Sequence, residues 1–380
     1  MSTLKVDGIR SNSASSDAIT LAGDGTCTAN ITNNLSNRNK VINGGMIVKQ
    51  RADLTMTTSS TYSLDRFRGA VGSSFNWSSA TVTQSTTSPD GFGNSLKVDI
   101  ASTNTPTGSQ NALIQTKIEG QDLQDLAYGT SSAKQCILSF YVRSNKTGTY
   151  CVQIANTGNT KYVLFEYTIN SADTWERKSV TFSGNTANTL NNDNALGFDI
   201  NFHLATGSDD HASATSTWTT YTGGSYKSTS NQVNLFDNAS NEWYLTGVQL
   251  EVDNTGSGVA TDFEHRSYAQ ELQLCRRYYH AILGKMGSWG SAVAYSTQNA
   301  QGWYSINPEM RASPTFSFTG TLRLEDGASN YNSTYTSAST AMGPHGFSWW
   351  AGGFTGLPDN YVYYVYDANQ SGYFQLDAEL

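Results

Sequence analysis

The sequence has few charged residues and no long apolar segment. Charged side chains make up 14% of its 380 residues, compared with about a quarter in ordinary globular domains. Its 23 Lys and Arg against 31 Asp and Glu give a formal charge of -8. Phosphate and anionic lipid contacts need a positive field, so neither nucleic acid nor a membrane surface is an expected partner. No segment approaches the roughly 18 apolar residues that cross a bilayer, so we expect no membrane insertion.

Proline and apolar residues are also scarce. The sequence has 6 Pro and 37% hydrophobic residues, whereas Gly, with 34 residues, and Tyr, with 21, are common. Threonine and aromatic side chains fit a pleated surface, and Gly and Asn favour turns, so we expect an all-β chain. An aromatic content of 12% carries too much buriable area for a disordered chain.

The four cysteines form no closely spaced pair. Because they stand in apolar segments, we expect buried free thiols at Cys27, Cys136, Cys151 and Cys275. A hairpin turn at residues 145–148 would set Cys151 opposite Tyr141. That register leaves Cys151 too far from Cys136 for a disulfide.

The first forty residues contain two short alternating stretches that could bury almost nothing alone. Such thin strands need partners for their edges and apolar faces, so we expect 1–40 to be a stalk. No apolar run of about 7–15 residues follows a basic start, so a secretory signal peptide is not expected.

Residues 41–265 contain many alternating strand candidates separated by Asn, Gly and Asp. This rhythm predicts a two-sheet sandwich or jelly roll. The alternation places two sets of side chains in its core: Leu138, Phe140 and Val142, and then Val163, Phe165, Tyr167 and Ile169.

A helix linker is predicted at residues 266–284. Ser267 and Gln270 form a capping box, and Gly284 supplies a left-handed stop. Apolar residues recur at helical spacing between them, at Leu272, Cys275, Tyr279 and Ile282.

Short strands resume in 285–380, which predicts a small carboxyl-terminal β domain. We expect this domain to be too small for a generous core of its own, which favours sharing a core with other copies of the chain.

Several segments in fixed order resemble a module of fibre and other surface proteins of tailed phages, notably marine phages of cyanobacteria. They include RNKVINGGMIVKQR, YSLDRFR, QTKIEGQDLQDL, NEWYLTGVQLEV and TDFEHRSYAQELQLCRRYYHA, between Arg38 and Ala281. NPEMRASPTF and YFQLDAEL also resemble the domain that follows this module, and STLKVDGIRS is similar to a virion-attachment start.

The resemblance implies a jelly roll similar to carbohydrate-binding modules, a homotrimer and a role in host attachment. The chain would be a tail fibre subunit in the virion, made in the host cytoplasm. Residues 1–40 would bind a tail or adaptor protein, and the host partner would be a surface glycan or another receptor. A capsid-surface decoration fibre remains open, as does a polysaccharide-degrading or carbohydrate-binding protein. The regular period of a tailspike β-helix is absent.

Exposed aromatic side chains are the candidates for glycan contact, because sugar rings stack on flat side chains. Two polar or Gly-rich stretches provide them: Trp218, Tyr221 and Tyr226, and then Trp349 and Trp350. Packing between subunits is the alternative for both clusters. Trp175 and Trp243 stand in strand-like segments, and we expect them in the core.

No catalytic, metal or cofactor site is expected. The acids Glu119, Asp122 and Asp125 suit a polar turn and short helical piece, in which Leu123 and Leu126 pack inward and the acids face water. Asp209, Asp210 and His211 lack the spacing of a known metal site and suit a solvated loop tip. The remaining histidines, His203, His265, His280 and His345, lie far apart, and no Ser or Cys context suggests a catalytic triad.

Overall fold

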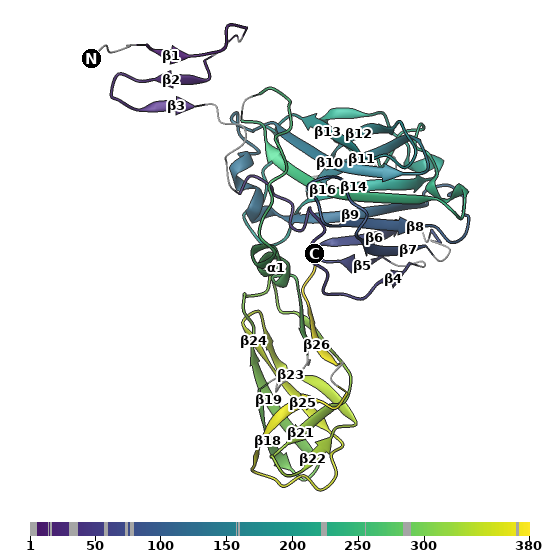
Figure 1. Cartoon of the computed structure of the whole chain (residues 1–380), viewed down its shortest axis with the longest axis vertical. Coiled ribbons are helices and arrows are strands. Elements are labelled where there is room, and N and C mark those ends of the chain that lie inside the picture. The colour runs from purple at the N-terminus through teal and green to yellow at the C-terminus, as the bar shows by residue number, and fades with distance from the viewer. Residues whose placement is uncertain are drawn as a thin grey trace.

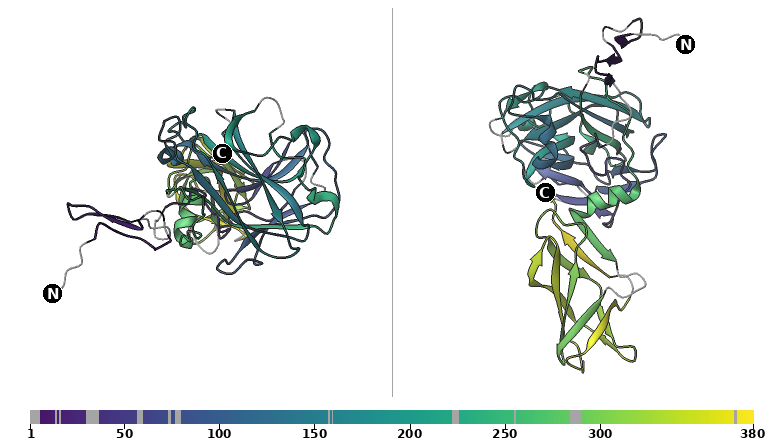
Figure 2. Two further views of the ribbon diagram at one scale, coloured as in Figure 1. Left: turned by 90° about the horizontal axis from the view of Figure 1, so that it is seen from above. Right: turned by 90° about the vertical axis from the view of Figure 1, so that its left-hand side faces the viewer.

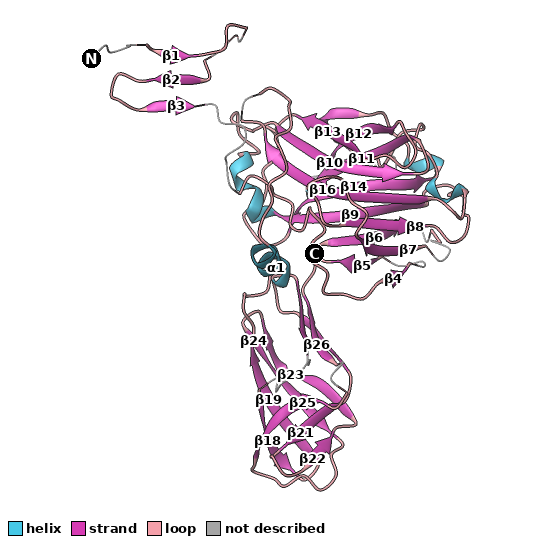
Figure 3. Ribbon diagram, in the orientation of Figure 1, coloured by secondary structure: helices cyan, strands magenta, loops and turns pink. Residues whose placement is uncertain are grey.

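The computed structural model consists mainly of strands, with one short α-helix among the residues that it describes and a few short 3-10 helices (Figure 3). It describes residues 6–13, 15, 17–29, 37–56, 60–72, 75–76, 80–156, 158, 160–221, 226–254, 256–283, 290–369 and 372–380. The predicted all-β fold is therefore confirmed for these residues. None of the helices in these ranges has the length and apolar character needed to cross a membrane.

The first three strands form an antiparallel sheet that projects away from the rest of the chain (Figure 1). They are β1 (Gly8–Ile9), β2 (Ile19–Leu21) and β3 (Cys27–Ala29). Ile9 is 53% exposed and Leu21 is 39% exposed, and no core cluster includes either side chain. This sheet buries almost nothing by itself, as the sequence predicts. Its role as an attachment stalk stays a prediction.

Two antiparallel sheets pack face to face in the middle of the chain. The six-stranded sheet, here called the β10 sheet, has the order β13 (Glu176–Phe182), β10 (Cys136–Ser144), β16 (Glu242–Val252), β8 (Ser95–Asp99), β7 (Thr81–Ser85) and β4 (Leu54–Thr55). The seven-stranded sheet, here called the β14 sheet, has the order β15 (Thr215–Thr220), β12 (Lys161–Ile169), β11 (Gly148–Asn156), β14 (Leu196–Thr206), β9 (Asn111–Glu119), β6 (Phe67–Gly72) and β5 (Thr61–Leu64). Short 3-10 helices occupy Gly120–Leu126, Ser208–Asp210 and Leu235–Asp237.

The core of this sandwich follows the alternation in the sequence. All seven side chains predicted to face inward, from Leu138 to Ile169, belong to one hydrophobic cluster or pack against it. Trp243 is fully buried in the same cluster, as predicted. The prediction for Trp175 is wrong, because its side chain is partly exposed and lies beside Tyr244 with the ring centroids 6.1 Å apart.

The predicted hairpin between β10 and β11 is wrong, because the two strands lie in different sheets. The segment between them therefore crosses from one sheet to the other. Cys136, Cys151 and Cys275 are buried free thiols, whereas Cys27 is a free thiol that is exposed, contrary to the prediction.

The linking helix α1 is shorter than predicted, spanning Tyr268–Arg276. Its start is as expected, because the Ser267 side chain accepts from Gln270 N and the Gln270 side chain accepts from Ser267 N. The chain then leaves the helix and forms β17 (Tyr279–Leu283), which pairs with β26 (Tyr373–Asp377) near the end of the chain. Gly284, the predicted helix stop, lies outside the described residues.

The last hundred residues form a separate body that joins the sandwich near α1 (Figures 1 and 2). One sheet has the order β17, β26 and β20 (Thr315–Thr319). The other, here called the terminal sheet, has the order β22 (Asn330–Asn332), β21 (Leu322–Glu325), β25 (Val362–Asp367), β18 (Ser291–Ser296), β19 (Asn299–Ser305), β24 (Gly346–Gly352) and β23 (Tyr335–Gly343).

This terminal body encloses its own core. The cluster includes Leu322, Leu324, Phe347, Trp349, Leu357, Tyr363, Val365, Phe374 and Leu376, all nearly inaccessible in a single copy. The expectation that this domain is too small for a generous core of its own is therefore wrong, because pairing β17 with β26 closes a second sheet over the first. The trimer itself stays a prediction.

Candidate functional site

Side chains on the outer face of the β14 sheet form a continuous row of hydrogen bonds. Arg68 Nε donates to Gln115 Oε1 at 2.7 Å, and Gln115 Nε2 donates to Asn201 Oδ1 at 2.7 Å. Asn201 Nδ2 donates to Gln153 Oε1 at 2.8 Å, and Gln153 Nε2 donates to the backbone oxygen of Tyr226 at 2.7 Å. Strand register creates the row, because its members are cross-strand partners on β6, β9, β14 and β11. We call this set the polar row: Arg68, Gln115, Asn201 and Gln153.

The polar row retains hydrogen-bonding capacity. Each of its three side-chain amides has two N–H donors, and the row itself uses one donor of each. Gln115 and Asn201 keep 9% and 6% of their surface exposed, and Arg68 is half-buried. A ligand that displaced the Arg68 side chain would meet fixed amides rather than mobile ones.

Asp199 lies beside the polar row with an unsatisfied carboxylate oxygen. It is 5% exposed, and its Oδ1 has no hydrogen-bond partner among the described residues. Burial raises the pKa of Asp199 to about 6, while the positive charges of Lys117 and Arg68 act in the opposite direction. Lys117 is its cross-strand partner, and Lys117 Nζ donates to the backbone oxygen of Leu380 at 2.7 Å. The site therefore contains a buried hydrogen-bond acceptor to which the described residues supply no donor.

Two of the predicted aromatic candidates, Tyr221 and Tyr226, border this face. Their rings are stacked, with centroids 4.0 Å apart and planes 10° apart. Tyr226 also lies against Tyr162 of β12, with centroids 5.7 Å apart. Both Tyr221 and Tyr226 are partly exposed and pack on a small cluster that includes Leu164. They stand at the end of the polar row, and their contact with a glycan stays a prediction.

Trp218 is not an exposed ring, contrary to the prediction. Its indole packs on Phe198 with the centroids 5.2 Å apart and meets Phe182 edge-on at 5.8 Å. Its Nε1 donates to the backbone oxygen of Ser183 at 3.0 Å. Trp218 is partly exposed and packs against the sandwich core.

Trp349 and Trp350 point to opposite faces of the terminal sheet. Trp349 is 3% exposed and belongs to the core, so the prediction for this residue is wrong. Gly302 makes room for it, since a Cβ there would lie 2.3 Å from Trp349 Cζ2. Trp350 is partly exposed on the outer face and meets the Tyr295 hydroxyl through its indole N–H.

The sequence interpretation missed the polar row and Asp199. A signal was present, because Gln115, Gln153 and Asn201 each interrupt an apolar strand at an outward position. A polar side chain flanked by buried apolar neighbours must find partners across the sheet. Which strands would be neighbours was not readable from the pattern.

Cys151 and His203 are opposed across β11 and β14, but both are held neutral. Burial raises the pKa of the Cys151 thiol and lowers the pKa of His203 to about 3. A nucleophilic cysteine needs a thiolate and a nearby cation. This pair therefore belongs to the packing of the face rather than to catalysis.

Two of the acidic residues considered in the sequence, Asp210 and Glu119, are buried and bonded to basic side chains. Asp210 is fully buried and bonded to Lys227 and Asn111, each at 2.8 Å, so it is not a solvated loop tip. Across the described ranges, no group of three or more His, Cys, Asp or Glu is placed to hold a metal ion. Glu119 is also buried and receives two bonds from Arg277, at 3.0 and 2.9 Å, so the expectation that it faces water is wrong. Leu123 and Leu126 are buried, as predicted.

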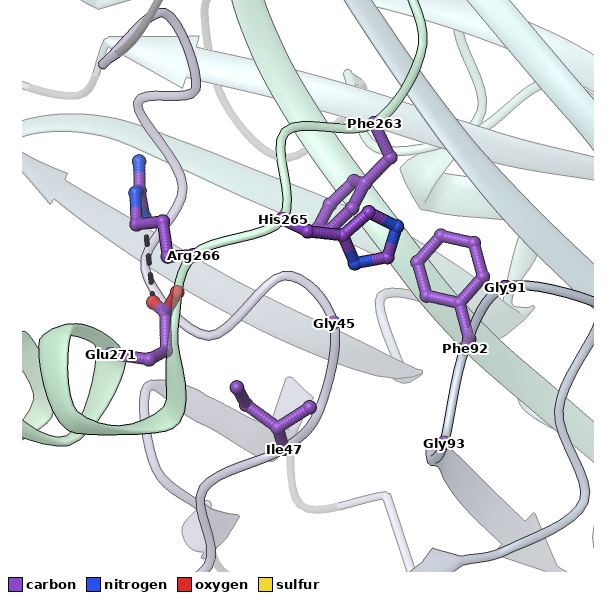
Figure 4. A pocket seen from close by; sticks show the side chains of 9 residues that line it. All are labelled: Gly45, Ile47, Gly91, Phe92, Gly93, Phe263, His265, Arg266 and Glu271. Carbon is purple, nitrogen blue, oxygen red and sulfur yellow. Dashed lines mark hydrogen bonds and ion pairs between the residues drawn. The ribbon is translucent and has the colours of Figure 1, made fainter.

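A small cavity near the start of α1 is too tight for a ligand (Figure 4). It measures about 40 Å³ and is lined by Ile47, Phe92, Phe263, His265 and Glu271, among others. In Figure 4 the rings of His265, Phe263 and Phe92 lie together, and each pair of ring centroids is about 5 Å apart. A volume of this size holds about one water molecule.

Comparison with known proteins gives matches of fold only. No family model matches the chain, and neither does any curated protein. A candidate sugar-binding protein from Bacteroides thetaiotaomicron is 14% identical, covering 57% of this chain and 100% of its own, with a TM-score of 0.34. A carbohydrate-binding module in complex with β-1,4-galactotriose is 8% identical, covering 57% and 99%, with a TM-score of 0.27. The enzymatically active domain of tailspike protein 4 of bacteriophage CBA120 is 13% identical, covering 56% of this chain and 21% of its own, with a TM-score of 0.26.

The groups on the outer face of the β14 sheet indicate what kind of ligand it could bind. Fixed amides donate and accept, Asp199 accepts, and tyrosine rings offer flat apolar surfaces at one end. Recognition sites for polar small molecules combine an apolar wall with a few placed hydrogen-bonding groups in this way. This combination suits a neutral polyhydroxylated ligand.

Proposed function

We propose that the chain is a homotrimeric tail fibre subunit of a tailed-phage virion that attaches to a host surface glycan. The observation that carries the glycan part is the polar row beside Asp199, bordered by the stacked Tyr221 and Tyr226. Sugar hydroxyls both donate and accept hydrogen bonds, so a glycan matches fixed amides and an unpaired carboxylate oxygen together. The C–H face of a sugar ring matches the tyrosine rings.

The geometry favours binding over cleavage. Glycoside hydrolysis uses two carboxyl groups across the scissile bond, whereas the charges that act on Asp199 are the cations Lys117 and Arg68. A pKa of about 6 would suit a general acid, which makes a polysaccharide-degrading enzyme the second candidate. Without a second carboxylate acting at this position, adhesion is the better match.

The amino-terminal sheet supports a fibre in which copies or partners cover exposed strands. Its exposed Ile9 and Leu21 need apolar neighbours that a single copy does not provide. The proposed partner there is a tail or adaptor protein of the virion. A capsid-surface decoration fibre would use the same parts with a different anchor.

A binding experiment on the full chain tests the glycan proposal. Host surface polysaccharide is titrated into the wild type, Asp199→Asn and the control Asp173→Asn, which changes a half-exposed aspartate paired with Arg143 at 2.8 Å. Loss of a hydrogen bond to a charged group corresponds to roughly 10-fold to 100-fold weaker binding. We expect this loss for Asp199→Asn and unchanged binding for the control. Equal affinity in all three proteins would refute the site.

Two further measurements address the rival functions. Released reducing ends after incubation with the same polysaccharide would favour the enzyme. Antibody against residues 285–380 should label the tail of the particle, and labelling of the shell would favour a decoration fibre.

A further inference from the structure

The terminal sheet carries an unusual concentration of exposed apolar side chains. Eleven large hydrophobic side chains are strongly exposed in the described part of the chain, and six of them lie in the terminal body. These six are Val293, Tyr295, Trp303, Tyr361, Val362 and Tyr364. Between residues 37 and 283 the described residues have two, Val259 and Tyr268. Contiguous apolar surface of this kind marks an interaction site.

Strand register gathers these side chains on one outer face. Val362 of β25 pairs with Val293 of β18, which pairs with Gln301 of β19, which pairs with Trp350 of β24. A second row runs through Tyr364, Ser291, Trp303 and Ser348 on the same four strands. An open hollow of about 580 Å³ lies over Val293, Gln301 and Trp303. We call this surface the aromatic face: Val293, Tyr295, Trp303, Trp350, Val362 and Tyr364.

The four strands that carry the aromatic face have no charged outward side chain. The next strand, β21, places Arg323 and Glu325 opposite Tyr366 and Tyr364, and these two side chains pair with one another at 3.5 Å. The outward side chains of the four strands are Ser, Val, Tyr, Gln and Trp, at positions 291, 293, 295, 301, 303, 305, 348, 350, 362, 364 and 366. The chain as a whole carries a formal charge of -8. Two copies would repel one another over most surfaces, since like charges in contact are unfavourable. Over β25, β18, β19 and β24 they can approach without placing carboxylates together, because the carboxylate beside these strands, Glu325, is paired with Arg323.

We propose that the aromatic face is the surface through which copies of this chain associate. Val362 stands at the β25 end of the row with Val293 next to it, and they are 65% and 45% exposed. A branched aliphatic side chain gives a sugar ring no flat surface to stack on, whereas it packs well between proteins. Tryptophan and tyrosine are enriched in protein interfaces and carry much of their binding energy. The inference rests on the proposed homotrimer and identifies its contact surface.

The terminal body has a core of its own, and this determines how two copies would meet. Because that core is closed within one copy, a single folded copy already presents this sheet face. Copies would meet by rigid docking of this face rather than by exchanging core side chains. The contact then depends on a few exposed residues that can be changed without disturbing the fold.

Sedimentation equilibrium of the full chain tests the contact. Val362→Lys places a charge on the aromatic face, and Val259→Lys is the matched control at a 70% exposed valine outside it. Loss of a central interface residue weakens association by roughly 30-fold or more. We expect Val362→Lys to shift the mass towards the 41.2 kDa of one chain, with an unchanged circular dichroism spectrum and melting temperature. Val259→Lys should sediment like the wild type.

Thiol labelling provides a second readout that does not depend on weakening the contact. In a Cys27→Ser background, Val362→Cys should react slowly with a maleimide in the oligomer and rapidly after dilution. Val259→Cys should react at the same rate under both conditions. Rapid labelling of Val362→Cys in the oligomer would overturn the inference.

The remaining outcomes separate this inference from the glycan proposal. A wild type that sediments as a single 41.2 kDa chain at its highest soluble concentration overturns the contact. Unchanged mass with lost glycan binding in Val362→Lys would show a ligand surface and also overturns it. If copies associate through this face but no glycan binds, the contact stands and the glycan proposal fails.

Discussion

Arg66 and Glu379 form a buried ion pair although 313 positions separate them in the sequence. Arg66 is 1% exposed, and its guanidinium lies 3.4 Å from the centroid of the Tyr278 ring. Arg51 reaches the same glutamate at 3.3 Å and lies 3.6 Å over Tyr279. The last residues of the chain are thereby held against the sandwich next to the start of β17. This cluster sets how the terminal body sits on the sandwich.

Glu379→Gln should destabilise the chain strongly, because it leaves Arg66 buried without its partner. Breaking a buried pair typically costs about 3–5 kcal/mol of unfolding free energy, and urea denaturation measures the loss. Asp173→Asn, which removes the more exposed pair with Arg143, should cost about 1 kcal/mol or less. A double replacement, Arg66→Leu with Glu379→Leu, should recover much of the stability. Equal losses for the two single variants would contradict this account.

Strands could be predicted from the sequence because their side chains alternate with period two. Phe140 and Val142 on β10 illustrate this, since each apolar position faces the core that the pattern implied. The same rule also shows why Trp349 and Trp350 cannot share an environment, a consequence that we did not draw from the sequence. The capping box at Ser267 was likewise a local signal and gave the start of α1 correctly.

Contacts between distant segments could not be predicted. Tyr279–Leu283 fits a helical pattern as well as a strand, and its pairing with Tyr373–Asp377 decides between them. The polar row has the same origin, since Gln115 and Asn201 become neighbours only when β9 and β14 pair. Local sequence identifies an outward polar residue but not the strand that will lie beside it.

Asp199→Asn should stabilise the chain at neutral pH and not in acid. Folding raises the pKa of Asp199 from 3.8 to about 6, because burial disfavours the charged carboxylate. The folded chain therefore binds this proton more tightly, so the stabilising contribution is complete below pH 3.8 and is lost as pH rises to about 6. The wild type therefore loses about 3 kcal/mol of unfolding free energy by pH 7, whereas Asp199→Asn cannot ionise and does not lose it. Unfolding free energies of both proteins from pH 3.5 to 7.5 measure it, and parallel curves would contradict the assignment.

His203 should make the wild type less stable as the pH falls, whereas Asp199 makes it less stable as the pH rises. Burial lowers the pKa of His203 from 6.5 to about 3, and both ring nitrogens lack partners among the described residues. The unfolded chain takes up this proton first, so the stability contributed by the neutral ring is present above pH 6.5 and is lost as pH falls towards 3. His203→Gln should therefore gain about 2 kcal/mol on the wild type between pH 7 and pH 5. His345→Gln, at a 77% exposed side chain, should show no such gain, and an equal gain there would assign the effect elsewhere.

Trp218 and Tyr226 should respond differently to replacement, although the sequence suggests the same role for both. Trp218→Ala removes a ring packed on Phe198 and a hydrogen bond to Ser183, so it should lower the unfolding free energy by about 3 kcal/mol. It should leave glycan affinity unchanged in the protein that remains folded.

Tyr226→Ala removes one ring of the stacked pair at the end of the polar row, so it should weaken glycan binding by roughly 10-fold, with a smaller loss of stability. Tyr226→Phe keeps the ring and should retain most of the affinity. Calorimetric titration beside urea denaturation separates the two effects, and a loss of affinity in Trp218→Ala without a loss of stability would return Trp218 to the binding surface.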